Sequence, residues 1–294
     1  MDTIEILAEL GFSADRAPRI TPFVSEEDGE KYEVWRVSLP QKEYVLKRSK
    51  GQEKEIYEKY LKDSHGATPE IYASVSSGGN DYLLMEYIQG DTLSRMDRSK
   101  LILALDALIS LQQTYWEDRE ADGSAYGFEK SLDGRVHRGK HLNSPLLEQA
   151  YAVYLDLYRS IPKTLCHDDL LPFNVIASSD RAAIVDWEVA GILPYPTSLA
   201  RLLAHADSSE DGLFRVSKEE KEFAIDYYYN KLIKPKGIDR GTYKRTLEAF
   251  FFYEYCEWVM LEVKYGGTDP YRYKKYLALA EASAKDILKN KNIG

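Results

Sequence analysis

Apolar and polar residues alternate along much of the first 88 residues, which is the pattern of β-strands that bury one face. A short amphipathic helix is predicted first, over residues 3–10. One further helix interrupts the strands, because Ile56, Tyr57, Tyr60 and Leu61 recur at helical spacing. The predicted strands cover residues 19–24, 32–39, 43–49, 70–76 and 81–88, and the second predicted helix covers residues 52–63.

After the Gln-Gly-Asp turn at residues 89–91 the hydrophobic period changes to that of helices, and only residues 164–189 still look like strands. The change predicts an α+β, two-lobed chain: a small antiparallel-sheet lobe over residues 1–88 and a larger, mainly helical lobe over residues 89–294. Such an arrangement places a ligand site between the lobes, near residue 89. The predicted helices of the second lobe cover residues 101–116, 146–161, 197–206, 218–233, 242–265 and 271–290.

Composition narrows the class of partner. Of the 294 residues 44% are hydrophobic, which suffices for a packed core, and the net charge of -9 argues against nucleic acid as a partner. Cys166 and Cys256 lie far apart, without the spacing of a zinc site or a disulfide framework. Acidic residues occupy the amino terminus where a signal peptide is basic, and no stretch approaches the roughly 20 apolar residues that span a bilayer. We therefore expect a cytoplasmic protein without a membrane partner.

The strand-like interruption contains an unusual density of polar chemistry, in the sequences CHDDLLPFNVI (166–176) and VDWEVAG (185–191). Phosphoryl transfer from a nucleotide needs a carboxylate that orients the attacking hydroxyl, oxygen ligands for magnesium, and cations on the phosphates. Asp169 would accept the hydroxyl proton, while Asn174 and Asp186 would bind Mg²⁺ through hard oxygen atoms. A predicted hairpin brings Asp186 back beside Asn174, which makes this spacing plausible.

The pattern His167-x-Asp169-x-x-x-x-Asn174, followed by Asp186-Trp187-Glu188, resembles the catalytic signature of the aminoglycoside phosphotransferase and choline kinase superfamily. These are small-molecule kinases with a protein-kinase-like fold, and the resemblance covers roughly residues 20–289. It implies ATP, with GTP as an alternative, and Mg²⁺ as cofactors. A histidine such as His167 is more often structural than catalytic, and we expect it to brace the loop.

The resemblance also implies nucleotide contacts in the first lobe. Lys47 corresponds to the lysine of the third strand that binds the α- and β-phosphates, and Glu53 to its ion-pair partner. Glu55 and Glu58 compete for the partner's role, but Glu53 shares the face of the apolar stripe, from which Glu55 points away. The backbone carbonyl of Glu86 and the backbone amide of Ile88 would meet the edge of the adenine, and these contacts involve no side-chain chemistry. Without the later motif, Lys47 and Glu53 would be read as surface charges.

One segment differs from protein kinases, and two differ from the small-molecule kinase family. The metal-binding Asp186 leads almost directly into a helix, so there is no room for the activation segment of a protein kinase, and a small hydroxyl-bearing substrate is favoured. The phosphate-covering loop, residues 25–31, has a single glycine, Gly29. Where the family usually has an aspartate before its Leu-Ala helix the chain has Ser198, which we expect to cap that helix.

The substrate itself is left open by the sequence. Residues 250–261 carry an aromatic stripe that is most simply a buried helix face, but Glu254 and Glu257 could instead hold an amine. Asp168, where many relatives carry glycine, would add to the same negative field. We therefore expect a small, cationic, hydroxyl-bearing partner such as an aminoglycoside, choline or an amino alcohol, and a monomer or a weak dimer. The alternative is a kinase-shaped binding protein without phosphotransfer activity.

Overall fold

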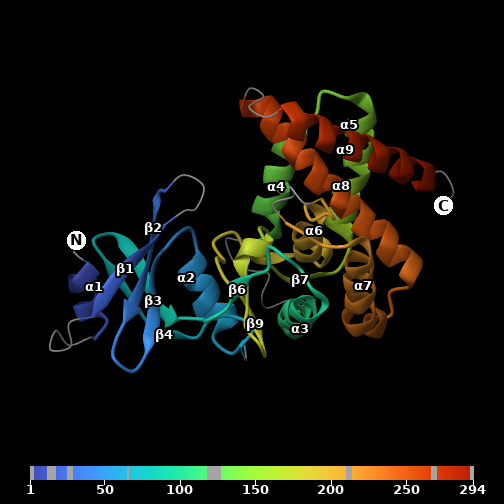
Figure 1. Ribbon diagram of the computed structural model, residues 1–294. Helices are drawn as coiled ribbons and strands as arrows, with labels where there is room; N and C mark the ends of the chain where they lie inside the picture. The colour runs from blue at the N-terminus through green and yellow to red at the C-terminus, as the bar shows by residue number, and fades with distance from the viewer. Residues whose placement is uncertain are drawn as a thin grey trace.

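The two-lobed α+β architecture is visible in Figure 1, where a twisted sheet lies to one side of a larger helical body. The computed structural model describes residues 3–11, 18–24, 29–64, 66–117, 127–209, 214–265 and 270–291. The phosphate-covering loop predicted at residues 25–31 lies partly outside these ranges, because residues 25–28 are not among them.

The first lobe is a five-stranded antiparallel sheet in the order β1-β2-β3-β5-β4. Successive side chains of β5 point to opposite faces of the sheet, and both faces are apolar. Leu84 packs with the first helix, α1, whereas Leu83 and Met85 face the second helix, α2. The elements are α1 (Thr3–Glu9), β1 (Arg19–Val24), β2 (Lys31–Ser38), β3 (Glu43–Ser49), α2 (Glu53–Ile56), its continuation as a π-helical turn η1 (Tyr57–Leu61), β4 (Ile71–Ser77) and β5 (Asn80–Glu86).

The second lobe surrounds small strand pairs with helices. Strand β6 (Asp91–Thr92) pairs with β8, which forms a hairpin with β9, and β7 pairs with β10. The elements are α3 (Arg98–Thr114), α4 (Phe128–Gly139), α5 (Pro145–Ser160), β7 (Lys163–Cys166), η3 (Pro172–Asn174), β8 (Val175–Ala177), β9 (Ala182–Ile184), β10 (Gly191–Pro194), α6 (Pro196–Ala204), α7 (Lys218–Tyr228), η4 (Tyr229–Ile233), η5 (Lys234–Lys236), α8 (Arg240–Tyr265) and α9 (Pro270–Lys291).

Two elements of this lobe differ from the sequence expectation. Strand β10 lies beyond residue 189, where we expected strand-like structure to end, and it pairs residue by residue with β7. Helix α4 was not predicted, because its buried side chains include only one apolar residue, Leu132, beside the guanidinium of Arg135. No described helix is both long and apolar enough to cross a membrane.

The core of the second lobe fixes the segment that carries the motif. Trp187 is fully buried, and its indole donates a hydrogen bond to the carbonyl of Ile184 at 2.9 Å. Gly90, in the connection between the lobes, lies so close to β8 that a Cβ atom there would be 2.5 Å from the carbonyl oxygen of Ala177. The connection therefore requires glycine at this position.

Candidate active site

The catalytic-loop motif forms the compact structure that its spacing predicts. Val175 pairs with Ile184 in the β8–β9 hairpin, and the amide of Val185 donates to the carbonyl of Asn174 at 2.9 Å. Asp186 therefore follows directly after a residue bound to Asn174. The Asn174 side-chain amide donates in turn to the backbone carbonyl of Asp169 at 2.8 Å, so hydrogen bonds join Asn174 to Asp169 and to Val185, the neighbour of Asp186 in the chain.

His167 braces this loop, as expected. Its Nδ1 accepts from the amide of Asp169 at 3.2 Å, and its Nε2 lies 2.9 Å from the carbonyl of Val185. A nitrogen that accepts from an N–H carries no proton, so the proton is on Nε2, which donates to Val185. Burial lowers the pKa of His167, which keeps the ring neutral.

Ser198 has a different role from the one we expected. Helix α6 begins at Pro196, so Ser198 lies inside its first turn and makes no capping bond. Its hydroxyl instead accepts from the amide of His167 at 2.8 Å and donates to the carbonyl of the same residue at 3.3 Å. The expectation of a helix cap was wrong because proline occupies the first turn, and the side chain reaches the catalytic loop instead.

Lys47 lies between two carboxylates, one from each lobe. Its ammonium group is 2.7 Å from Oε1 of Glu53 and 2.5 Å from Oδ1 of Asp186. Oε1 of Glu53 also accepts the amide of Trp187 at 3.2 Å, so helix α2 is bound to the segment after β9. Burial lowers the pKa of Lys47, but the negative charges of Glu53 and Asp186 outweigh it and the pKa is raised, so the lysine is positively charged. The ion pair of Lys47 on helix α2 is therefore with Glu53, the residue that we selected, and not with Glu55.

Asp186 has a backbone conformation that is rare for a residue with a side chain. Its φ is 68°, in the left-handed region, which typically costs on the order of 1 kcal/mol or more and is concentrated at functional sites. The conformation belongs to the turn that follows Val185, and the side chain is bound to Lys47.

Asn174 and Asp186 fit the requirements of a magnesium site. Among the described residues, Oδ1 of Asn174 and Oδ2 of Asp186 have no hydrogen-bond partner, so both oxygens are available as ligands. The described part of the chain offers no group of three or more metal-ligating His, Cys, Asp or Glu side chains. A site with two protein oxygens matches the usual coordination of Mg²⁺, which is held by one or two side chains while phosphates and water complete its coordination shell.

The predicted adenine-binding residues lie at the end of β5 and just after it. The carboxylate of Glu86 is ion-paired with Arg181 of the β8–β9 turn, and the side chain of Ile88 is 7% exposed. The side chain of Glu86 is thus occupied by Arg181 and that of Ile88 is buried, so only backbone groups of these residues would be available to adenine. The adenine-binding role of Glu86 and Ile88 stays a prediction.

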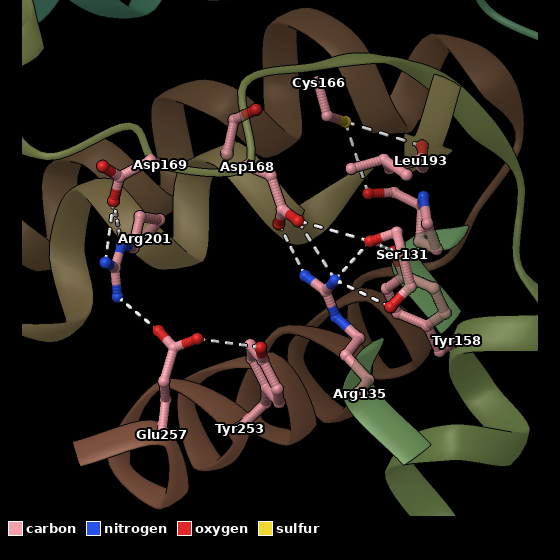
Figure 2. Close-up of polar contacts among 12 residues, drawn as sticks. Ser131, Arg135, Tyr158, Cys166, Asp168, Asp169, Leu193, Arg201, Tyr253 and Glu257 are labelled. Atoms are coloured by element: carbon pink, nitrogen blue, oxygen red, sulfur yellow. Dashed lines mark hydrogen bonds and ion pairs between the residues drawn. The ribbon is translucent and has the colours of Figure 1, made fainter. Parts of the chain in front are cut away.

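Sequence analysis did not identify Arg201, on α6, which binds the carboxylate of Asp169 (Figure 2). Its Nε and Nη2 donate to Oδ1 of Asp169 at 3.0 and 2.7 Å, and its Nη1 donates to Glu254 at 2.9 Å and to Glu257 at 2.8 Å. The proposed amine contact of Glu254 and Glu257 is therefore wrong: both carboxylates already bind a guanidinium. The only signal in the sequence is that arginine is the one charged residue of this helix.

Asp168 also has a cationic partner, and its side chain faces away from that of Asp169 (Figure 2). Arg135 of α4 binds its two oxygens with Nη2 at 2.5 Å and Nη1 at 3.1 Å. Both side chains are largely buried, with exposed fractions of 18% for Asp168 and 2% for Arg135. Asp168 therefore does not add a free negative charge to the site, which corrects our expectation.

Beside this pair, a cavity of about 180 Å³ separates α4 from the segment after Trp187. Lys130, Arg135 and Arg138 line it on the α4 side, facing Asp168 and Glu188. Among the described residues Glu188 has no ion-pair partner. The charges around the cavity are nearly balanced, in contrast with the strongly acidic chain as a whole.

Comparisons with known proteins agree with the fold and the motif. The LicA protein of Haemophilus influenzae is 25% identical over 95 residues, which are 32% of this chain and 33% of LicA, so the match spans about a third of that relative. A Ralstonia eutropha protein described as a candidate aminoglycoside phosphotransferase has a similar solved structure, with a TM-score of 0.66, 14% identity and coverage of 98% of both chains.

A second solved structure is that of an aminoglycoside phosphotransferase from Streptomyces rimosus in complex with ADP and streptomycin. Its TM-score is 0.53 at 15% identity, and the superposition covers 88% of this chain and all of the other. At these identities the solved structures support the kinase-like fold. The sequence itself matches the model of the phosphotransferase enzyme family over residues 20–228, which include the whole catalytic motif. The chain therefore belongs to the phosphotransferase enzyme family.

Proposed function

We propose that the protein transfers the γ-phosphoryl group of ATP to a hydroxyl group of a small molecule. One observation carries the proposal: Lys47 of the sheet contacts Asp186, and Val185, the residue before Asp186, is hydrogen-bonded to Asn174. Asn174 is bound in turn to the backbone of Asp169. Chance alone would rarely place a phosphate-binding cation, two metal-binding oxygens and a carboxylate base in one connected group. The kinase-shaped binding protein remains the alternative, but it would have no need for the complete set.

In the proposed reaction Asp169 orients the acceptor hydroxyl and takes its proton. The hydroxyl oxygen forms a bond to the γ-phosphorus, the bond from that phosphorus to the β–γ bridging oxygen breaks, and ADP leaves. Lys47 would bind the α- and β-phosphates, with Glu53 holding its ammonium group in place. Mg²⁺, held by Asn174 and Asp186, would neutralise charge on the phosphates.

The lobes would divide this work at residue 88. We propose a nucleotide-binding lobe over residues 1–88 and a lobe with catalytic loop and substrate site over residues 89–294. The pairing of Asp91 and Thr92 with β8 supports a boundary just before these residues. Glu86 and Ile88 would then present the backbone edge for adenine, and the same edge would distinguish ATP from GTP.

An amine-bearing acceptor is the finer version of the proposal. It is supported by the neighbour that binds streptomycin, an aminoglycoside, and by Glu188, whose carboxylate lines the cavity beside α4 and would face an amine bound there. The pairing of Asp168, Glu254 and Glu257 with arginines weakens it. Amino sugars and amino alcohols should therefore be compared with neutral sugars of similar size, at low and high salt, because salt screens a charge preference.

The two aspartates test the proposal, since they have different jobs. Asp186→Asn replaces the carboxylate by an amide of the same shape, which also tolerates the left-handed backbone but binds metal more weakly. Both the magnesium-dependent melting shift by ATP and the turnover should therefore be lost. Asp169→Asn should keep the melting shift and lose about a hundredfold to ten-thousandfold in turnover. Melting curves with Mg²⁺ and ATP or GTP, with EDTA as the control, and a coupled assay of ADP release would measure both. A wild-type protein without any nucleotide-dependent melting shift would favour the binding-protein alternative.

A further inference from the structure

The carboxylate of Asp169 is held on one side only. Both hydrogen bonds from Arg201 reach Oδ1, whereas Oδ2 has no partner among the described residues. The side chain is 40% exposed, so without Arg201 its rotation would be restrained by little else. The arrangement leaves Oδ2 as the oxygen that can receive an acceptor hydroxyl.

Arg201 is itself rigidly held by helix α8. Its exposed fraction is 14%, and its Nη1 lies between the carboxylates of Glu254 and Glu257. Each carboxylate has a further partner: Glu254 is 3.2 Å from Nε2 of His205, and Glu257 accepts the hydroxyl of Tyr253 at 3.1 Å. A planar guanidinium that is fixed at three corners is a stiff connection between α8 and the catalytic loop.

We propose that Arg201 is a positioning residue of the transfer reaction: it holds Asp169 by Oδ1 so that Oδ2 receives the acceptor hydroxyl. The inference rests on the proposed function of Asp169. It predicts an effect on turnover and not on nucleotide binding, because Arg201 contacts neither Lys47 nor the metal-binding oxygens. Loss of correct orientation at a reacting group costs about ten- to a hundredfold in rate.

A purely structural role would look different, and it must be separated experimentally. Glu254 is 3% exposed, so replacing Arg201 alone would leave a buried carboxylate with only His205 beside it and could unfold the lobe. Replacing Glu254 with glutamine removes that charge. The variant Glu254→Gln is therefore the reference, and Arg201→Met/Glu254→Gln removes the contact with Asp169 without leaving that charge unpaired.

The experiment measures ADP release from Mg·ATP with water as the acceptor, together with melting curves with and without Mg·ATP. Relative to Glu254→Gln, we expect Arg201→Met/Glu254→Gln to lose about ten- to a hundredfold in kcat, with KM for ATP and the melting shift by ATP within about twofold. Arg201→Lys/Glu254→Gln should recover part of the rate, because one ammonium group keeps the charge but not the fork of two bonds. Equal kcat in the reference and the methionine variant would overturn the proposal.

A second readout works even if the wild-type protein releases no ADP, an outcome that would count against the proposed function instead. Asp169→Asn should lower the melting temperature in the Glu254→Gln background, where it weakens the contact with Arg201. The same substitution should not lower the melting temperature when Arg201 is methionine. An identical effect in both backgrounds would show that Arg201 does not hold Asp169.

Discussion

The buried pair of Arg135 and Asp168 offers the sharpest test of the packing around the catalytic loop. Replacing Asp168 with asparagine keeps the shape but leaves the guanidinium without its counter-charge. Arg135 would retain its bond to the hydroxyl of Tyr154 at 2.8 Å and its stacking over the rings of Tyr158 and Tyr253, each 4.6 Å away. None of these groups carries a compensating negative charge.

Breaking a buried ion pair by removing one partner costs about 3–5 kcal/mol. The lower end applies here, because Asp168 is 18% exposed and asparagine still accepts one N–H, so we expect Asp168→Asn to lose about 3 kcal/mol of unfolding free energy. With a denaturant slope of about 3 kcal/mol per molar urea, the midpoint of unfolding should fall by about 1 M.

Removing both charges should restore most of this loss. In Arg135→Met/Asp168→Asn the methionine side chain fills the space that the arginine side chain occupied. The remaining loss of unfolding free energy is about 1 kcal/mol, because the hydroxyl of Tyr154 loses its hydrogen-bond donor. Tryptophan fluorescence can follow unfolding of the helical lobe, where Trp116, Trp187 and Trp258 lie. A midpoint of Asp168→Asn within about 0.2 M of the wild type would refute the reasoning, as would a double variant less stable than the single one.

Three further predictions concern stability. Burial lowers the pKa of His167, so below pH 6.5 the unfolded chain binds a proton at this residue and the folded chain does not. The melting temperature should therefore fall as the pH drops below about 6.5, and His167→Asn should weaken that pH dependence. Gly90→Ala should cost about 1–3 kcal/mol of unfolding free energy and lower the melting temperature by several degrees, because its Cβ would collide with the carbonyl oxygen of Ala177. The control is Gly134→Ala in α4, where only a flexible side chain lies nearby, and it should be neutral or stabilising. Burial lowers the pKa of Lys221 to about 8, so Lys221→Met should raise the melting temperature at pH 7, and raise it less at pH 9.5, where the wild-type lysine is already neutral. Differential scanning fluorimetry across pH measures all three, and a pH-independent gain for Lys221→Met would contradict the last.

The sequence predicted the elements whose buried face is apolar. The long helices and the strands of the first lobe agree with the expected ranges to within a few residues, because their periods of apolar residues are long and regular. Helix α4 could not be found this way, since the residue it buries most fully is Arg135, whose partner Asp168 lies 33 positions away. When the buried face of a helix is polar and its hydrogen-bond partners lie on a distant segment, the sequence of the helix shows no periodic pattern of apolar residues.

The same distinction applies to the site. The arrangement of Asp169, Asn174 and Asp186 is largely local, because a hairpin of fixed length returns the chain, and their spacing therefore predicted their proximity. The contact between Arg201 and Asp169 depends on how α6 packs on the loop, and that of Arg201 with Glu257 spans 56 positions. Such contacts are set by tertiary packing, and short sequence patterns do not record them.

The hydroxyl of Ser198, which holds both backbone groups of His167, gives the catalytic loop an anchor without a titratable group. An aspartate at this position, as the resemblance to the family would suggest, loses its acceptor strength once it is protonated in acid. A serine hydroxyl neither gains nor loses a proton across that range. Acid inactivation of this protein should therefore begin at the carboxylates and at His167, while the tie between α6 and the loop persists until the lobe itself unfolds.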